Sequence, residues 1–160
     1  MAQVLFVRDG DNYREASAQD ILDRASSLIA QRFRAGAPVI DSPQRTREFL
    51  QHQIGGLQYE VFGALLLDNR HRLIRCKILF RGTIDGASVY PREVVREVLD
   101  ANAAALVLFH NHPSGVNLPS PADELVTKRL REAMQLIDVR VLDHIIVGEN
   151  FYSFAEAGLL

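Results

Sequence analysis

Apolar residues recur at helical spacing over residues 16–34, which predicts an amphipathic helix there. Gly36 and Pro38 follow and should end it. A second helix is predicted from Ser42 to about Gln53, because a capping serine is followed by a proline at the first helical position. The N-terminal part of the chain is therefore predicted to be helical.

The pattern changes after residue 58. Residues 59–67 are apolar at successive positions, as in a strand that other elements cover on both faces. The elements predicted after it are strands at 73–80, 104–109, 139–147 and 151–152, helices at 91–103 and 120–136, and a capping box at 153–156. Strands that alternate with helices predict an α/β fold of three layers, in which helices flank a central mixed β-sheet.

The composition is that of a folded protein. Of the 160 residues, 48% are apolar and 24% are charged, which excludes a disordered or fibrous chain. The single cysteine, Cys76, excludes an intramolecular disulfide and a cysteine-based zinc finger. A metal would therefore need histidine and carboxylate ligands.

The chain shows no sign of membrane insertion or secretion. No apolar run approaches the roughly 20 residues that span a bilayer, and the N-terminus lacks the pattern of a signal peptide. We therefore expect a cytoplasmic protein. The net charge of −2 argues against a protein whose main role is to bind a phosphate backbone.

One stretch of the chain is nevertheless strongly basic. It contains Arg70, Arg72, Arg75, Lys77 and Arg81, with no acidic residue among them. Such a basic stripe can contact nucleic acid. It is more often the solvated face of a strand, which is the interpretation we favour.

Two histidines follow the predicted strand 104–109. His110 stands at its end and His112 lies two residues on, so both imidazoles point to the same side if the chain stays extended. Asp123 lies in the first turn of the next predicted helix, on a stripe with apolar residues, so it should face inward. An inward carboxylate needs a partner, which a cation held by the two imidazoles would supply.

These three donors are typical of a catalytic metal site. Two neutral imidazoles and one carboxylate leave a coordination position open, as catalytic zinc sites do. Iron(II) accepts the same ligands, so both metals stay open. Taken singly, each histidine could instead be a loop residue that is hydrogen-bonded to the backbone.

Glu60 and Ser120 complete the candidate site. Glu60 shares a strand face with Phe62, where an acid is either at the solvated start of the strand or placed as a general base. Ser120, three residues before Asp123, is either a helix cap or a hydrogen-bond donor to a developing oxyanion, and the two roles are compatible. The combined spacing favours a metal site over separate structural roles.

The motif formed by these residues resembles that of a known family. Glu60 with the spacing His-x-His-x7-Ser-x2-Asp at residues 110–123 is similar to the JAMM (MPN+) metalloprotease motif, and most similar to the bacterial RadC-like group. The segments that carry this closer resemblance are 91–93, 103–105, 110–115, 143–148 and 152–159. The resemblance covers about residues 42–160.

The resemblance implies a fold, a cofactor and a set of roles. The family fold is a mixed sheet flanked by helices, similar to that of cytidine deaminases. One Zn²⁺ per chain would be held by His110, His112 and Asp123. Glu60 would act as the base and Ser120 as the oxyanion partner.

It also implies a division of the chain. Residues 42–160 would form a JAB/MPN-type catalytic domain and residues 1–41 an N-terminal helical extension. The chain would be a short form, because 1–41 is too short for the helix-hairpin-helix region usual in RadC proteins. The loop after Gly115 also departs from the group, with Val116-Asn117 where Asp-Pro is frequent.

Three functional hypotheses follow. The favoured one is a zinc-dependent metallohydrolase that cleaves peptide or isopeptide bonds in a peptide or protein substrate. The second is a DNA-binding or nuclease factor associated with DNA repair, which uses the same metal site and the basic stripe. The third is a non-catalytic interaction module, which would need neither Glu60 nor Ser120.

Two other side chains that could carry chemistry are given structural interpretations. His144 lies among apolar residues in the predicted strand 139–147 and is interpreted as a hydrogen-bonded core histidine, with a ligand-orienting residue or third imidazole as the alternative. Cys76 lies between two basic residues, but the sequence places no base beside it. We assign it no role.

Overall fold

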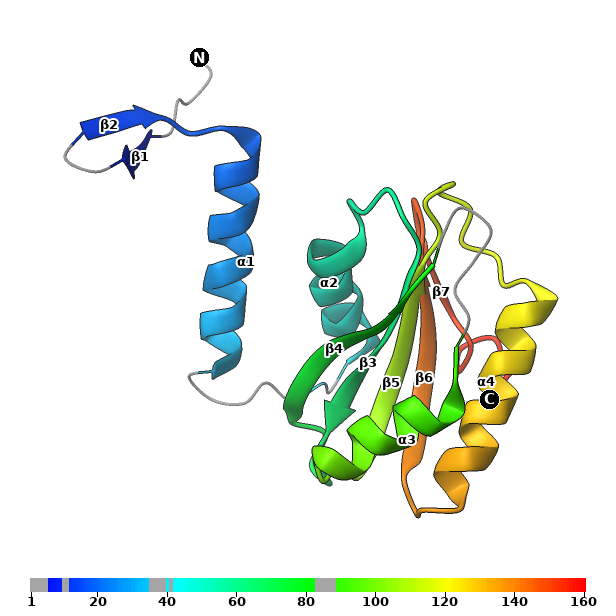
Figure 1. The fold of residues 1–160 in the computed structure, drawn as a ribbon. Coiled ribbons are helices and arrows are strands. Elements are labelled where there is room, and N and C mark those ends of the chain that lie inside the picture. Colours follow the sequence, from blue (N-terminus) through cyan, green and yellow to red (C-terminus); the bar gives the residue numbers. More distant parts are fainter. Residues whose placement is uncertain (1–5, 10–11, 35–39, 41, 83–88) are drawn as a thin grey trace. The chain divides into compact units, whose positions relative to one another are not determined.

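The computed structural model of the protein describes residues 6–9, 12–34, 40, 42–82 and 89–160 (Figure 1). The chain divides into two compact units, residues 1–36 and 37–160. Among the helices of the described part, none has the length and apolarity needed to cross a lipid bilayer.

The N-terminal unit contains a hairpin and a helix. Strand β1 (Phe6–Asp9) pairs antiparallel with β2 (Asn12–Glu15), and α1 (Ala18–Arg34) follows, as predicted for residues 16–34. Asp20 joins the hairpin to the helix, since its carboxylate accepts hydrogen bonds from Arg14 at 2.7 Å and from the Ser17 amide at 2.9 Å. The hairpin was not predicted, because β2 is exposed along its whole length and so has no apolar alternation.

The second unit is built on a five-stranded sheet. Its elements are α2 (Pro43–Ile54), β3 (Val61–Leu67), β4 (Leu73–Arg81), α3 (Pro91–Asp100), β5 (Ala105–Asn111), α4 (Pro121–Gln135), β6 (Arg140–Val147) and β7 (Phe151–Ser153). The strand order is β4-β3-β5-β6-β7, in which β5 and β6 are parallel and the other neighbours are antiparallel. Helices α3 and α4 cover one face and α2 the other (Figure 1). The predicted three-layer α/β fold with a mixed sheet is confirmed.

The core lies on both faces of the central strands. Every residue of β3 and β5 is buried, which is why their sequences are apolar at successive positions. On one face, Phe62 and Leu108 pack against Val98 of α3 and Leu130 of α4. Buried Phe49, Leu50 and Ile54 of α2 lie on the opposite side of the sheet.

Several boundaries differ from the prediction; for example, β3 begins at Val61 rather than at residue 59. Helix α3 ends at Asp100 rather than 103, because Asn102 takes a left-handed conformation (φ 49°) before β5. Strand β5 continues to Asn111, because it pairs with β6 as far as Asn111↔Val147. At the capping box predicted at 153–156, the Glu156 amide donates to Ser153 Oγ at 3.1 Å, but the chain continues in turns and forms no helix.

Gly63 of β3 lies close to both neighbouring strands, β4 and β5. A Cβ at this position would overlap the Phe109 ring and lie 2.5 Å from the Lys77 carbonyl oxygen. Gly63→Ala should therefore lower the free energy of unfolding by about 1–3 kcal/mol, because the strands must move apart. Urea denaturation measures this. Gly56→Ala, whose Cβ would meet nothing within 4 Å, is the matched control and should change it little; equal effects would contradict the packing argument.

Candidate metal centre

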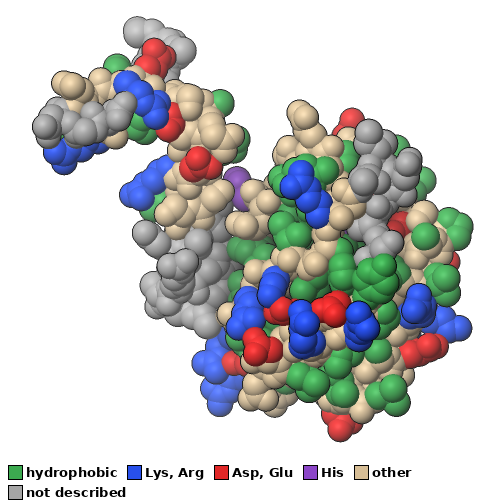
Figure 2. All heavy atoms as spheres, in the orientation of Figure 1, with side chains coloured by type: hydrophobic (Ala, Val, Ile, Leu, Met, Phe, Trp, Pro, Cys, Tyr) green, Lys and Arg blue, Asp and Glu red, His purple; other side chains and the backbone are tan. Residues whose placement is uncertain are grey.

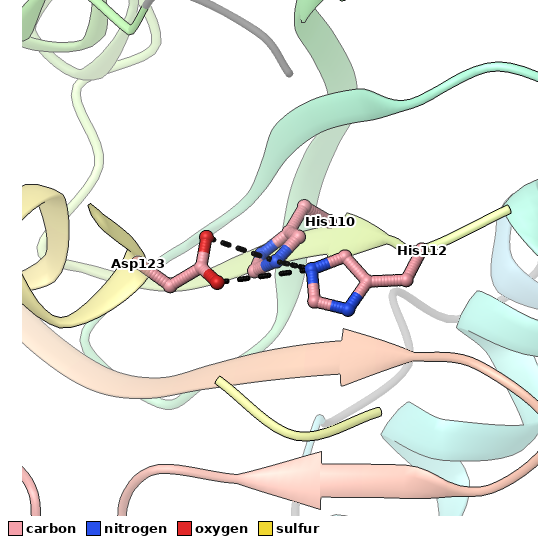
Figure 3. Close-up of side chains that lie close together, drawn as sticks. All are labelled: His110, His112 and Asp123. Atoms are coloured by element: carbon pink, nitrogen blue, oxygen red, sulfur yellow. Dashed lines mark hydrogen bonds and ion pairs between the residues drawn. The ribbon is translucent and has the colours of Figure 1, made fainter. Parts of the chain in front are cut away.

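The candidate site lies at the C-terminal end of β5, where the strand meets the start of α4. His110 is the last residue but one of β5, and His112 directly follows the strand. The amide of His112 still donates to the Val147 carbonyl of β6 at 2.9 Å, so the chain stays extended between the two histidines. Asp123 lies in the first turn of α4 and faces both rings (Figure 3).

The three predicted ligands converge. His110 Nε2 lies 2.9 Å from His112 Nε2 and 3.2 Å from Asp123 Oδ1, and His112 Nε2 lies 3.7 Å from Asp123 Oδ2. One donor atom from each residue lies within 4.8 Å of the other two, and within the described part of the chain only this group does so. The side chain of His110 is 1% exposed, whereas those of His112 and Asp123 are 18% and 15% exposed. The site is therefore closed at its base and open to solvent on one side.

This donor set fits a divalent transition metal. Two imidazole nitrogens and a carboxylate oxygen are the ligands of catalytic zinc sites, and the solvent-facing side leaves room for a further ligand. Non-haem iron(II) uses the same three donors, so the geometry does not distinguish the two metals.

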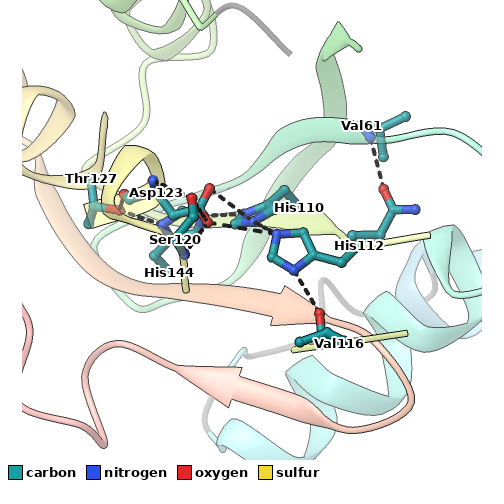
Figure 4. Close-up of polar contacts among 9 residues, drawn as sticks. Val61, His110, His112, Val116, Ser120, Asp123, Thr127 and His144 are labelled. Carbon is teal, nitrogen blue, oxygen red and sulfur yellow. Dashed lines mark hydrogen bonds and ion pairs between the residues drawn. The ribbon is translucent and has the colours of Figure 1, made fainter. Parts of the chain in front are cut away.

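Ser120 caps α4 and contacts the carboxylate of Asp123. The Ser120 hydroxyl and amide donate to Asp123 Oδ2 at 2.6 and 2.7 Å, and the Asp123 amide donates to Ser120 Oγ at 3.2 Å (Figure 4). This reciprocal pair is a capping box with aspartate at the third position. The serine thus has the structural role that the sequence allowed, and it also lies against a candidate ligand.

Each histidine is held through its second ring nitrogen. His112 Nδ1 lies 2.7 Å from the carbonyl oxygen of Val116, and His110 Nδ1 lies 2.8 Å from Nε2 of His144. His144 is fully buried and its Nδ1 lies 2.5 Å from the Thr127 hydroxyl, so it is a hydrogen-bonded core histidine, as predicted. Both Nε2 atoms are left for the candidate metal.

Burial dominates the protonation of the two inner histidines. It lowers the pKa of His110 to about 4 and the pKa of His144 well below its usual value. The nearby Asp123 carboxylate opposes the shift of His110 but does not cancel it. Neutral imidazoles are the form that binds a metal.

Glu60 directly precedes β3 at the same end of the sheet. Phe62 pairs with His110 across β3 and β5, and the two rings stack with centroids 6.1 Å apart. Glu60, two residues before Phe62, is therefore on the same face as His110 if the alternation of β3 continues. Its carboxyl is not one of the three grouped donors.

Asn111 fixes the backbone on both sides of Glu60. Its side-chain oxygen accepts from the Val61 amide at 2.8 Å, and its side-chain nitrogen donates to the Tyr59 carbonyl at 3.1 Å. Neither Asn111 nor Thr127 was predicted from the sequence. Asn111 could have been noticed as a polar residue on a buried strand, and Thr127 as the residue one helical turn after Asp123.

Most of the basic stripe is neutralised in the fold. Lys77 pairs with Glu97 of α3 at 2.5 Å, and Arg75 lies 3.2 Å from Asp100. In addition, Arg72 pairs with Asp68 at 2.6 Å, and the Arg81 guanidinium lies 3.6 Å from the centroid of the Tyr59 ring. Figure 2 shows basic and acidic side chains close together on the face that carries α3. This mixed surface lacks the single sign of charge that favours a phosphate backbone.

Comparison with known proteins matches most of the chain to one family. A family model described as RadC-like JAB domain matches residues 40–159. The chain belongs to this family. The assignment agrees with the predicted resemblance, and the mixed sheet flanked by helices is consistent with the JAB/MPN fold.

Several relatives of this RadC-like JAB domain are named UPF0758 proteins. One from Thioalkalivibrio sulfidiphilus is 53% identical over 145 residues, which cover 91% of this chain and 65% of the relative. One from Vibrio cholerae is 50% identical over 141 residues, 88% of this chain and 89% of the relative. One from Nitrosococcus oceani is 58% identical over 123 residues, 76% of this chain and 55% of the relative. The chain thus spans less than two thirds of the first and third, and the shared name states no activity.

The buried histidines should make the metal-free RadC-like JAB domain sensitive to acid. An unfolded histidine gains a proton below about pH 6.5, whereas folded His110 stays neutral to about pH 4. The unfolded state therefore binds more protons in this range, and the free energy of unfolding falls as the pH falls. We expect His110 to account for a loss of about 2 kcal/mol between pH 7.5 and 5.

Urea denaturation in the presence of a chelator at several pH values measures this loss. His110→Gln, which removes the titrating ring, should show a smaller dependence on pH. A stability that is constant from pH 7.5 to 5 in the unsubstituted protein would contradict the burial of a neutral imidazole.

Proposed function

We propose that this RadC-like JAB domain is a zinc-dependent metallohydrolase that cleaves peptide or isopeptide bonds in a peptide or protein substrate. The observation that carries the proposal is the convergence of His110, His112 and Asp123 around one point that is closed below and open to solvent. A purely structural zinc site would be fully enclosed by protein ligands.

Nε2 of each histidine and the Asp123 carboxylate would hold the metal. Both Nδ1 atoms are already engaged, one by His144 and one by the Val116 carbonyl, so each ring presents its other nitrogen. A bound zinc ion lowers the pKa of water to about 7 and polarises a carbonyl group.

Glu60 is proposed as the general base. In amide hydrolysis the attacking water gives up a proton, the C–N bond breaks, and the leaving amine must gain a proton. A single carboxylate can accept the first proton and deliver it to the amine. The position of Glu60 directly before β3, which pairs with the strand that carries His110, supports this role.

Ser120 is proposed as a hydrogen-bond donor to the developing oxyanion. Its hydroxyl donates to Asp123 Oδ2, at the open side of the site. Rotation about one bond would redirect that proton to a carbonyl oxygen, while the Ser120 amide continues to hold the carboxylate. A donor in this place would stabilise charge that appears only during the reaction.

A cavity of about 410 Å³ adjoins His112 and offers a path for a substrate. Its walls include the main chain at Gly55, Gly56, Gly115 and Gly148. At Gly56 a Cβ would meet nothing within 4 Å, so an extended peptide can approach the backbone closely there and form main-chain hydrogen bonds. This lining supports a peptide substrate over a small enclosed metabolite.

The metal site is tested by zinc content. Elemental analysis should find about one zinc per chain in the unsubstituted protein and no stoichiometric zinc in His112→Ala, because one of three ligands is lost. His52→Ala, at an exposed histidine of α2, is the matched control and should keep its zinc. Full occupancy in His112→Ala would overturn the assignment.

The catalytic role of Glu60 is tested with a library of peptide and isopeptide substrates, with and without chelator. Glu60→Gln should retain zinc but lose roughly 10²–10⁴-fold in cleavage rate, because the amide cannot accept the proton. Glu132→Gln, at an exposed acid of α4, should cleave at the unsubstituted rate. Cleavage that survives the chelator, or an unimpaired Glu60→Gln, would contradict the mechanism.

A further inference from the structure

We propose that Thr127 and His144 are positioning residues for the metal site. They form a chain of hydrogen bonds that starts at His110, ends on the main chain of Asp123, and fixes which nitrogen of His110 is available to the metal. This inference rests on the metal site proposed above, and it adds two residues that do not touch the metal.

The direction of the chain is set at Thr127. Its Oγ1 lies 2.5 Å from the carbonyl oxygen of Asp123, one turn earlier in α4, and 2.5 Å from Nδ1 of His144 (Figure 4). A carbonyl oxygen can only accept, so the one hydroxyl proton of Thr127 goes to Asp123. The hydroxyl oxygen must then accept a proton from Nδ1 of His144.

The same reasoning fixes the direction of the hydrogen bond between His144 and His110. A neutral imidazole carries one proton, so a His144 ring that donates from Nδ1 has a lone pair on Nε2. Nε2 lies 2.8 Å from Nδ1 of His110, which must therefore carry the proton that they share. His110 Nε2 is left with its lone pair, and this is the atom that faces His112 and Asp123.

The chain is buried and its rings are held by packing. His110 and His144 are 1% and 0% exposed, and Thr127 is 2% exposed. His144 stacks on Phe154 with ring centroids 4.8 Å apart and meets Phe62 edge-on at 5.4 Å. Hydrogen bonds in such a dry environment are strong, and an unsatisfied member is costly, so the arrangement should exist before a metal arrives.

Removal of the Thr127 hydroxyl should remove the constraint on the direction of these hydrogen bonds. In Thr127→Val, Nδ1 of His144 faces a methyl group and gains nothing from carrying a proton. The proton can then move to Nε2 of His144 and donate to His110, whose own proton shifts to Nε2. That nitrogen can no longer accept a metal until the proton is lost.

The test measures zinc affinity in the full chain by competition with a chromophoric chelator. Thr127→Val should bind zinc about 10–100-fold more weakly, which is the range expected when a hydrogen-bond partner of a metal ligand is lost. Thr127→Ser keeps the hydroxyl and should bind within about threefold of the unsubstituted protein. Rescue by serine separates the role of the hydroxyl from that of the side-chain volume.

Thr46→Val is the matched control. Thr46 of α2 is also buried, and its hydroxyl donates to the carbonyl oxygen of Ser42, the residue that caps this helix, at 3.2 Å. It contacts no candidate ligand by any hydrogen bond described for it. Thr46→Val should leave zinc affinity unchanged, and thermal unfolding without metal shows whether both valine variants are folded.

A second measurement uses the metal-free protein. Long-range ¹⁵N–¹H correlation spectra of the imidazole rings report which nitrogen carries the proton. His110 should be protonated at Nδ1 in the unsubstituted protein and in Thr127→Ser, and should shift towards Nε2 in Thr127→Val.

The outcomes separate this inference from the proposed function. If the unsubstituted protein binds no zinc, the metal site fails and the positioning role fails with it. If it binds zinc and Thr127→Val binds equally tightly, only the positioning role is overturned. The absence of a proton on His110 Nδ1 in the unsubstituted protein would also overturn it.

Discussion

The candidate site depends on one constraint: polar groups buried at the end of the central sheet must all find hydrogen-bond partners. The apolar core of β5 gives way at its end to His110 and Asn111, and the middle of β6 contributes Asp143 and His144. Each of these side chains finds its partner on another element, because an unsatisfied buried group costs about 1–3 kcal/mol. The same bonds that satisfy them join β3, β5, β6 and α4 around the three candidate ligands.

The hydrogen bonds of buried Asp143 stabilise the part of the fold that supports His144. Its carboxylate accepts from the Ser153 hydroxyl at 2.6 Å, from the His144 amide at 2.7 Å and from the Ala155 amide at 3.0 Å. These bonds hold the turn after β7 in place, and with it the Phe154 ring that stacks on His144. Exposure increases from His144 through His110 to His112, so the site is rigid at its base and accessible at its mouth. A catalytic metal site has the same two requirements.

Secondary structure and the ligand motif could be predicted because both depend on the intervals between residues that are close together in the sequence. The two-residue interval between His110 and His112 and the helical position of Asp123 needed only the geometry of a strand and of a helix. The hairpin β1–β2 was missed because its strands lack an apolar face. The end of β5 was misplaced because its last residues are polar yet pair with β6.

The sequence by itself therefore determined the family, the alternation of elements and the three candidate ligands, since periodicity and motif spacing are properties of neighbouring residues. Only the tertiary structure decided which side chains form pairs. His110 meets His144, 34 residues later, and Lys77 meets Glu97, 20 residues later. The order of strands and the side on which each helix packs select these pairs. The strand order and the packing of the helices depend on the burial of whole apolar faces. A local sequence pattern therefore does not predict which two side chains will be in contact.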